Sequence, residues 1–219
     1  MNSHEAIVRL EEGNARWVSG LRSIESIATP SQRASLAGGQ NPFAVVLSCS
    51  DSRAPSEMIF DQGLGDLFVV RVAGNVVAPS LVGSIEYAVH TFGTELVVVM
   101  GHTACGAVIA TLDAIDHGTD GTSENVLDIV RRIRPSVEPI AKGGDRTHRV
   151  GLATRANVRA SVKELARASA LLSERVAAGK LAIVGGEYDL ASGKVEFFEP
   201  PRRAAAASPR AGEVAAVPH

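Results

Sequence analysis

Two short segments carry the side chains that could do chemistry, and together they contain both cysteines of the chain. The first segment is CSDSR at residues 49–53 and the second is HTACG at residues 102–106. Two thiolates, one imidazole and one carboxylate make a plausible tetrahedral zinc set. The sequence therefore predicts a zinc site formed by four side chains, Cys49, Asp51, His102 and Cys105.

Each segment directly follows a compact apolar run, which predicts that both lie at the ends of strands. Residues i and i+2 of an extended segment point to the same side, so Cys49 and Asp51 can face one cavity. His102 and Cys105 are three positions apart at the start of an expected helix, where i and i+3 share a face. Open parallel sheets bind ligands beyond the carboxyl ends of their strands. We therefore expect the two segments to meet at that edge of the sheet.

Arg53 lies two residues beyond Asp51 and could hold that carboxylate in a bidentate pair. A zinc ion with four protein ligands is closed, whereas a hydrolytic zinc needs a position for water. If Arg53 draws Asp51 off the metal, the two cysteines and the histidine remain, and water or hydroxide can take the fourth position. Exchange of a carboxylate for hydroxide leaves the summed charge unchanged, so higher pH should favour the open form. Asp51 and Arg53 are thus the candidate catalytic residues.

The elements that must position these residues predict an α/β fold with a mostly parallel central sheet flanked by helices. Runs that suit strands covered on both faces lie at residues 43–47, 67–70, 96–100 and 181–184, with an edge strand at 194–199. Helical patterns lie at residues 4–19, 31–37, 79–92, 107–116, 124–134 and 151–178. Pro135 is expected to end the fifth helix, and residues 142–149 are expected to form a polar loop.

Composition excludes several classes of protein. With 219 residues and 45% hydrophobic content, the chain can form one domain, which we assign to residues 1–200, before a disordered Ala/Pro/Arg-rich tail at 201–219. The net charge of −2 argues against a broad nucleic-acid footprint. No apolar stretch approaches the roughly 20 residues that cross a bilayer, and the charged N-terminus does not resemble a secretory signal. We expect a cytoplasmic protein whose cysteines are ligands or nucleophiles.

The two motifs together resemble those of the β-class carbonic anhydrases. CSDSR followed about fifty residues later by HTACG carries the resemblance. It extends through GQNP at 39–42, DLFVVRVAGN at 66–75 and SIEYAV at 84–89, and it covers most of residues 1–200. The resemblance implies the β-carbonic-anhydrase fold and reversible hydration of carbon dioxide to bicarbonate and a proton, through a zinc-bound hydroxide.

The resemblance also implies roles for individual residues. The zinc ligands fall on Cys49, His102 and Cys105, and Asp51 either ligates zinc or pairs with Arg53. The family likeness further implies a homodimer or a homotetramer, with each active site near a subunit interface. The expected partners are a small-molecule substrate and further copies of the chain, with no nucleic acid and no membrane.

Further positions are assigned to substrate binding by the resemblance alone. Gln40 falls at a substrate-orienting position, and Phe68 and Tyr87 fall at pocket-lining positions. Composition by itself would make these three a turn residue and two core residues. Some family members hold a second bicarbonate with a tryptophan, an arginine and a tyrosine. Arg71 and Tyr87 match two of these, but Val46 replaces the tryptophan, which puts that regulatory site in doubt.

Other functions stay open at this point. The sequence does little to distinguish a carbonic anhydrase from a hydrolase of carbon disulfide or carbonyl sulfide on the same scaffold. A non-catalytic zinc-binding regulatory protein would prefer a permanently closed shell, and Arg53 beside Asp51 argues against permanence. A cysteine phosphatase needs a cysteine and an arginine separated by five residues, and Pro55 stands at that position.

Overall fold

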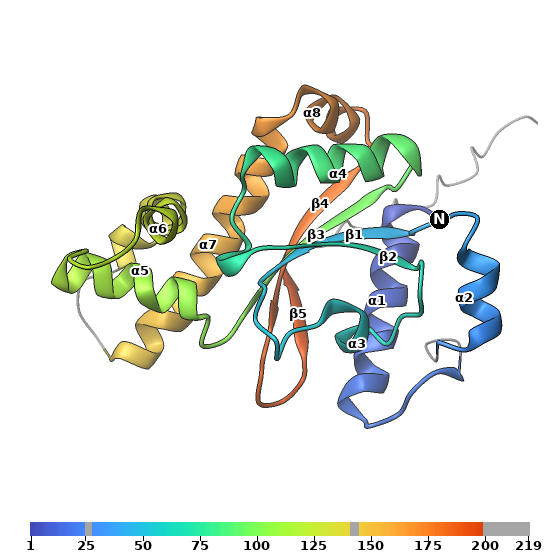
Figure 1. The fold of residues 1–219 in the computed structure, drawn as a ribbon, viewed down its shortest axis with the longest axis horizontal. Coiled ribbons are helices and arrows are strands. Elements are labelled where there is room, and N and C mark those ends of the chain that lie inside the picture. Colours follow the sequence, from blue (N-terminus) through green and yellow to red (C-terminus); the bar gives the residue numbers. More distant parts are fainter. Residues whose placement is uncertain (25–27, 141–144, 199–219) are drawn as a thin grey trace, which may run out of the picture.

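The computed structural model describes residues 1–24, 28–140 and 145–198 and contains a five-stranded sheet (Figure 1). The strand order is β2-β1-β3-β4-β5, and the strands are β1 (Ala44–Ser48), β2 (Leu67–Arg71), β3 (Leu96–His102), β4 (Ala182–Tyr188) and β5 (Val195–Phe198). The first four strands in this order are parallel, and β5 pairs with β4 in the antiparallel direction. The carboxyl ends of β1 and β3 therefore lie at the same edge of the sheet.

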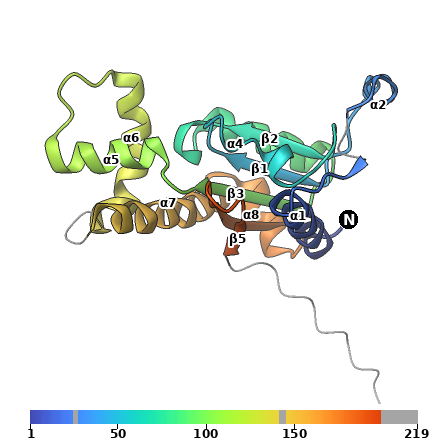
Figure 2. The same cartoon turned by 90° about the horizontal axis from the view of Figure 1, so that it is seen from below.

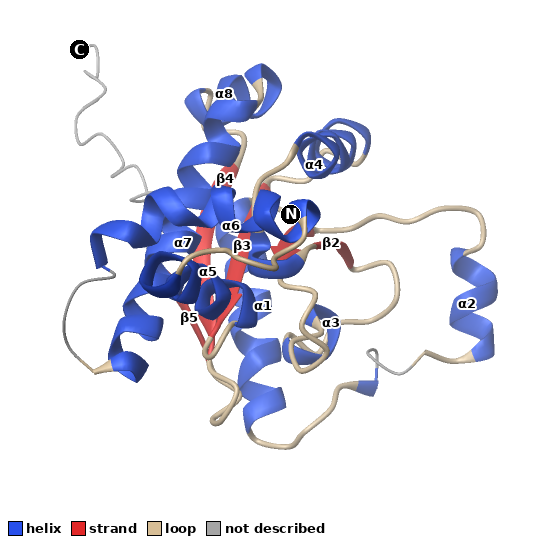
Figure 3. Ribbon diagram, turned by 60° about the vertical axis from the view of Figure 1, so that its left-hand side comes forward, coloured by secondary structure: helices blue, strands red, loops and turns tan. Residues whose placement is uncertain are grey.

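Helices connect the strands and supply the rest of the core. They are α1 (Ser3–Val18), α2 (Pro30–Leu36), α3 (Ser56–Ile59), α4 (Pro79–Thr91), α5 (Gly106–His117), α6 (Glu124–Val137), α7 (Arg146–Ala168) and α8 (Ala170–Ala177). In two views α5 and α6 project beyond one side of the sheet (Figures 1 and 2). On the opposite side α2 stands apart, joined through long loops, and none of its residues is buried (Figure 3).

Both faces of the sheet are covered, which explains why its strands are continuous apolar runs. On one face Leu10 of α1 belongs to a buried cluster with Val46 of β1. On the other face Ile85 of α4 and Val158 of α7 cluster with Val45 of β1. A third cluster joins α5, α6 and α7 and includes both cysteines, so the strand-end segments are embedded in a core of their own.

The predicted fold class is confirmed, since a mostly parallel sheet is flanked by helices on both faces. The four apolar runs form β1 to β4, and the expected edge strand is β5. The helices expected over 4–19, 31–37, 79–92 and 107–116 correspond to α1, α2, α4 and α5. The disordered tail predicted over 201–219, and with it the domain boundary at residue 200, lies outside the described residues and stays a prediction.

Pro135 does not end the fifth predicted helix, because α6 continues to Val137. A proline inside a helix removes one backbone donor and disfavours the turn before it. Here Ile133 and Val137 lie one turn apart on the same face, and both are fully buried. Their burial favours continuation of the helix past the proline.

The last helical stretch was predicted with the wrong limits. α7 begins at Arg146, inside the expected polar loop, because Asp145 caps it by accepting a hydrogen bond from the backbone N–H of His148 at 3.0 Å. The rest of that loop, 142–144, lies outside the described residues. The single helix expected over 151–178 is divided at Ser169, whose backbone is extended and whose hydroxyl caps α8 at Leu172. Ser169 also donates to Glu86 of α4, and this contact with another element favours the break.

None of the helices in the described parts of the chain combines the length and the apolar character that crossing a lipid bilayer requires.

The packing of α1 against the segment after α3 allows no side chain at Gly13. A Cβ atom placed there would lie 1.8 Å from the carbonyl oxygen of Phe60. We expect Gly13→Ala to lower the free energy of unfolding by about 3 kcal/mol or more, because the obstacle is backbone and cannot rotate away. Gly151→Ala, in α7, is the matched control: its Cβ would meet nothing within 4 Å, and it should raise that free energy by about 0.5–1 kcal/mol. Urea unfolding of both variants measures this, and equal midpoints would contradict it.

Candidate metal centre

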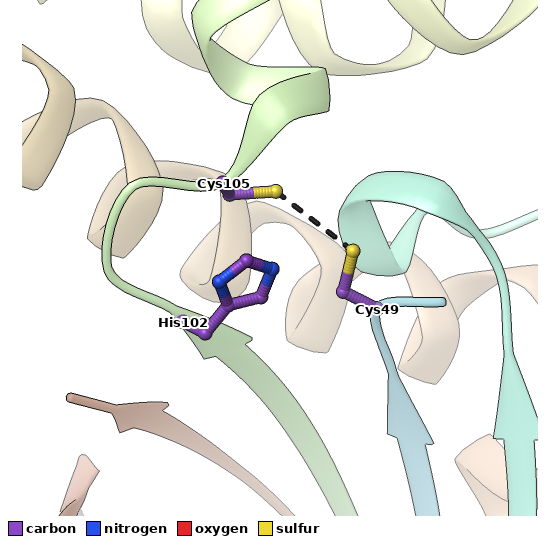
Figure 4. A group of neighbouring side chains, drawn as sticks. All are labelled: Cys49, His102 and Cys105. Carbon is purple, nitrogen blue, oxygen red and sulfur yellow. Dashed lines mark hydrogen bonds between the residues drawn. The ribbon is translucent and has the colours of Figure 1, made fainter. Parts of the chain in front are cut away.

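Three of the four predicted ligands come together at the carboxyl ends of β1 and β3. Cys49 follows β1, His102 is the last residue of β3, and Cys105 precedes the first residue of α5. One potential ligand atom from each of the three lies within 4.8 Å of the other two, and the two sulfur atoms are 4.0 Å apart (Figure 4). All three side chains are buried.

The approach of His102 to Cys105 has a different origin from the predicted one. The two residues do not share a helical face, because His102 ends a strand and Cys105 is the N-cap of α5. Between them Ala104 adopts a left-handed conformation with a φ of 54°, which is uncommon for a residue with a Cβ atom. This tight strand-to-helix turn brings the thiol back toward the imidazole.

The imidazole of His102 is oriented by the neighbouring backbone. Its Nδ1 lies 2.9 Å from the carbonyl oxygen of Thr103, which assigns the proton to Nδ1 and the lone pair to Nε2. Thr103 is itself held, since its backbone N–H donates to the carbonyl of Tyr188 and its hydroxyl accepts from the N–H of Leu190. The Nε2 atom is buried and has no hydrogen-bond partner among the described residues.

The two cysteines form one proton-sharing pair. The pKa of Cys49 is lowered, chiefly because the Cys105 thiol donates to it and also because the backbone N–H of Gly74 lies 3.4 Å from its sulfur. The pKa of Cys105 is raised, because its proton is held by Cys49 and because the thiol is buried. Such a pair, one thiolate beside one thiol, can bind a metal cation through both sulfurs once the thiol releases its proton.

This donor set fits a zinc ion. Two sulfurs that each lie about 2.3 Å from a tetrahedral zinc are about 3.8 Å apart, close to the 4.0 Å seen between Cys49 and Cys105. A buried imidazole nitrogen without a partner is costly unless a ligand satisfies it. The unpartnered Nε2 of His102 is therefore the feature that most directly points to a cation between the three side chains.

Asp51 stands beside this cluster but is turned toward Arg53. The Arg53 guanidinium donates to both carboxylate oxygens at 2.9 and 2.8 Å, and its backbone N–H donates to Oδ1 at 2.9 Å. These bonds hold the pKa of Asp51 well below its usual range. The Oδ2 atom of Asp51 is 3.8 Å from Nε2 of His102, so the carboxylate borders the cluster without belonging to it.

Arg71 holds the segment that carries Cys49 and Asp51, a role that the sequence did not indicate. Its Nε donates to the carbonyl oxygen of Cys49 at 3.0 Å, and its Nη2 donates to that of Asp51 at 2.6 Å. Arg71 ends β2 directly beside Ser48, the residue before Cys49, in the register of the sheet. Only knowledge of that register could have revealed the contact.

The residues assigned to substrate binding lie elsewhere in the same chain. Phe68 pairs with Val45, four residues before Cys49, which is about 13 Å along the sheet. The Phe68 ring is 6.3 Å from that of Tyr87, whose side chain is half exposed on α4. Gln40 is exposed in the loop after α2. The structure thus brings the metal ligands together within one chain but not the proposed pocket residues.

The fold and the cluster together define an α/β protein with a sulfur- and nitrogen-donor site at the carboxyl ends of its parallel strands. Residues 44–195 match the family model described as carbonic anhydrase. The chain belongs to the carbonic anhydrase family, in its β class. The match includes both motifs and every strand up to the start of β5.

Named relatives agree with this assignment. The chain is 46% identical over 188 residues to a carbonic anhydrase of Mycolicibacterium smegmatis, covering 86% of this chain and 89% of that protein. It is 46% identical over 185 residues to carbonic anhydrase 2 of Mycobacterium tuberculosis, covering 84% and 87%. Among solved structures, a tetrameric β-carbonic anhydrase of Sordaria macrospora is 26% identical with a TM-score of 0.69. The match covers 90% of this chain and 96% of that one. The β-carbonic anhydrase of Coccomyxa, solved in complex with acetazolamide, is 26% identical with a TM-score of 0.67. The match covers 84% of this chain and 82% of that one.

Proposed function

We propose that this chain catalyses the reversible hydration of carbon dioxide to bicarbonate and a proton, with zinc held by Cys49, His102 and Cys105. The observation that carries the proposal is the convergence of two sulfurs and an unpartnered buried nitrogen within 4.8 Å. Zinc supplies the Lewis acidity that makes water a nucleophile near neutral pH. The protein must then orient the attacking water, admit the substrate and keep the fourth position open.

Asp51 is the residue placed to orient the attacking water. Arg53 holds both oxygens of its carboxylate, and one of them, Oδ2, also lies 3.8 Å from Nε2 of His102. A carboxylate held in this way can accept a hydrogen bond from water beside the three ligands and so direct its lone pair at the carbon atom of carbon dioxide. The proton released in the reaction passes to solvent or buffer.

The same pair of residues can act as an open–closed switch. With Arg53 holding Asp51 at 2.8 Å, the two cysteines and the histidine would be the protein ligands of a bound zinc ion, and its fourth position would be left to water in the open form. Because Oδ2 of Asp51 lies 3.8 Å from Nε2 of His102, release of the carboxylate from Arg53 would let it join the donors and close the site. Arg53 therefore determines the fraction of protein molecules in the open form, which is the form that can hydrate carbon dioxide.

We further propose a homodimer or a homotetramer in which the pocket is completed between subunits. The family likeness assigns Gln40, Phe68 and Tyr87 to the pocket, yet Phe68 lies about 13 Å along the sheet from the Cys49 of its own chain. Gln40 and Tyr87 are exposed and are thus available to a neighbouring copy. The relative from Sordaria macrospora is tetrameric, which supports an assembly of this kind.

A cytoplasmic location is consistent with the chemistry of the site. The two thiols are free and lie 4.0 Å apart, and they must stay reduced to serve as ligands. Reducing compartments keep such pairs from forming disulfides.

The pH dependence of hydration tests the mechanism. The pKa of Asp51 is lowered by Arg53 and the pKa of Arg53 is raised by Asp51, so neither group changes charge near neutrality. Activity between about pH 6.5 and 9 should therefore follow the supply of hydroxide and rise with pH. Stopped-flow hydration of carbon dioxide with an indicator dye measures it on the zinc-loaded protein. A flat profile would count against the mechanism, and hydrolysis of carbonyl sulfide without hydration of carbon dioxide would contradict the substrate.

A further inference from the structure

We propose that Asn157, a buried residue in the middle of α7, positions the backbone N–H of Gly74 against the sulfur of Cys49 and so tunes the metal centre from outside its ligand shell. This inference rests on the proposed zinc site. The hydrogen bond that Asn157 makes goes to Gly74, in the turn at Ala73–Asn75, rather than to a residue of the metal cluster.

The first link is the contact between Gly74 and Cys49. The backbone N–H of Gly74 donates to the Cys49 sulfur at 3.4 Å. A donor aimed at a metal-bound thiolate withdraws charge from the sulfur and fixes its direction, as outer-shell partners do at metal sites generally. Its effect depends on how firmly the donor is held.

The second link is the backbone conformation of Gly74, which a glycine on its own could easily leave. Its φ is 71°, in the left-handed region that glycine enters freely. A Cβ atom at this position would lie 2.7 Å from Ile133 and 2.9 Å from Ala107, so the neighbouring side chains leave room for glycine alone. The turn is therefore built on the residue with the greatest backbone freedom. The backbone N–H of Asn75 donates to the carbonyl of Val72 across it, and the Gly74 carbonyl needs a restraint of its own.

The third link is Asn157, which supplies that restraint. Its side-chain Nδ2 donates to the carbonyl oxygen of Gly74 at 2.8 Å, across 83 residues of sequence. Asn157 is 2% exposed, so water does not compete for this bond. The amide holds the peptide on one side of Gly74 while the Cys49 sulfur accepts from the peptide on the other. Packing alone does not require an asparagine at this buried position of α7, because a leucine or a valine would fill it without burying a polar group.

The test uses the full chain and three variants. Asn157→Ala removes the donor, and Asn157→Asp keeps the shape but replaces the amide donor with a carboxyl oxygen that faces the Gly74 carbonyl. Thr154→Val is the matched control, because Thr154 lies almost one turn earlier, is equally buried, and donates within α7 to Val150. Zinc affinity is measured by competition with a chromophoric chelator, and the absorption spectrum is recorded after substitution with cobalt(II).

We expect both Asn157 variants to bind zinc about 10- to 100-fold more weakly than the wild type. Their sulfur-to-cobalt charge-transfer band should move to longer wavelength, because a thiolate that loses its N–H donor holds its electrons less tightly. Thr154→Val should match the wild type in both measurements. Wild-type affinity and an unmoved band in both Asn157 variants would overturn the inference, and so would an equal loss in Thr154→Val. A wild-type chain that binds no zinc would instead overturn the proposed site itself.

Discussion

Cys105→Ala is expected to abolish zinc binding and, with it, the hydration of carbon dioxide. The wild type should bind one zinc ion per chain, held by two sulfurs and one nitrogen. Removal of one ligand leaves Cys49 and His102, which cannot close a tetrahedral site. Because loss of an outer-shell partner alone costs about 10- to 100-fold in metal affinity, loss of a ligand should cost at least about 100-fold. Metal analysis after gel filtration and stopped-flow assays measure the two effects.

Val108→Ala is the matched control for this experiment. Val108 lies one turn further along α5, is fully buried and belongs to the same apolar cluster as Cys105. Its truncation leaves a cavity and lowers stability, but all three donors remain. It should therefore retain one zinc ion per chain and hydrate carbon dioxide. A Cys105→Ala protein that keeps its zinc and its full activity would refute the assignment of the ligands.

Arg53→Ala is expected to depress turnover by about 100-fold or more around neutral pH while zinc stays bound. Without the guanidinium, Asp51 loses both side-chain hydrogen bonds that turn it away from the cluster. Its carboxylate, already 3.8 Å from Nε2 of His102, is then attracted to the cation and closes the fourth position. Retention of the metal with loss of activity distinguishes this outcome from that of Cys105→Ala.

Arg132→Ala is the appropriate comparison for the arginine. Arg132 donates to both oxygens of Asp128 at 2.8 and 3.2 Å, in the same bidentate geometry, but the Asp128 carboxylate lies on the exposed surface of α6. Its loss should leave turnover and zinc content unchanged. An Arg53→Ala protein with the turnover and pH profile of the wild type would remove the basis for the switch.

Much of the fold was predictable because its signals are local. The central strands β1 and β3 are buried throughout, so each is a short apolar run with polar or glycine-rich flanks. Two of the errors in the helices arose where packing or a distant contact outweighed a local preference. Pro135 stays within α6 because its neighbours Ile133 and Val137 are buried, and Ser169 divides two helices because Glu86 and Leu172 bind its hydroxyl.

The choice of candidate metal ligands likewise rests on local signals. Cys49 and Cys105 each follow an apolar run closely, and strands of one parallel sheet end at the same edge. Residue type and chain position therefore sufficed to predict which two sulfurs and one nitrogen converge in the structure. They do not determine which way a side chain turns: Asp51 was expected either among the ligands or paired with Arg53, and in the structure it is paired with Arg53.

The groups that hold the site depend on pairing between distant segments. Arg71 reaches the Cys49 carbonyl across 22 residues, and Asn157 reaches Gly74 across 83. Such contacts follow from strand register and from the seating of α7 on the sheet, and no short motif encodes either one. Donor chemistry could thus be deduced from residue types, whereas the restraint of those donors arises only when the chain is folded, because distant side chains make it with backbone carbonyls whose direction depends on the whole sheet.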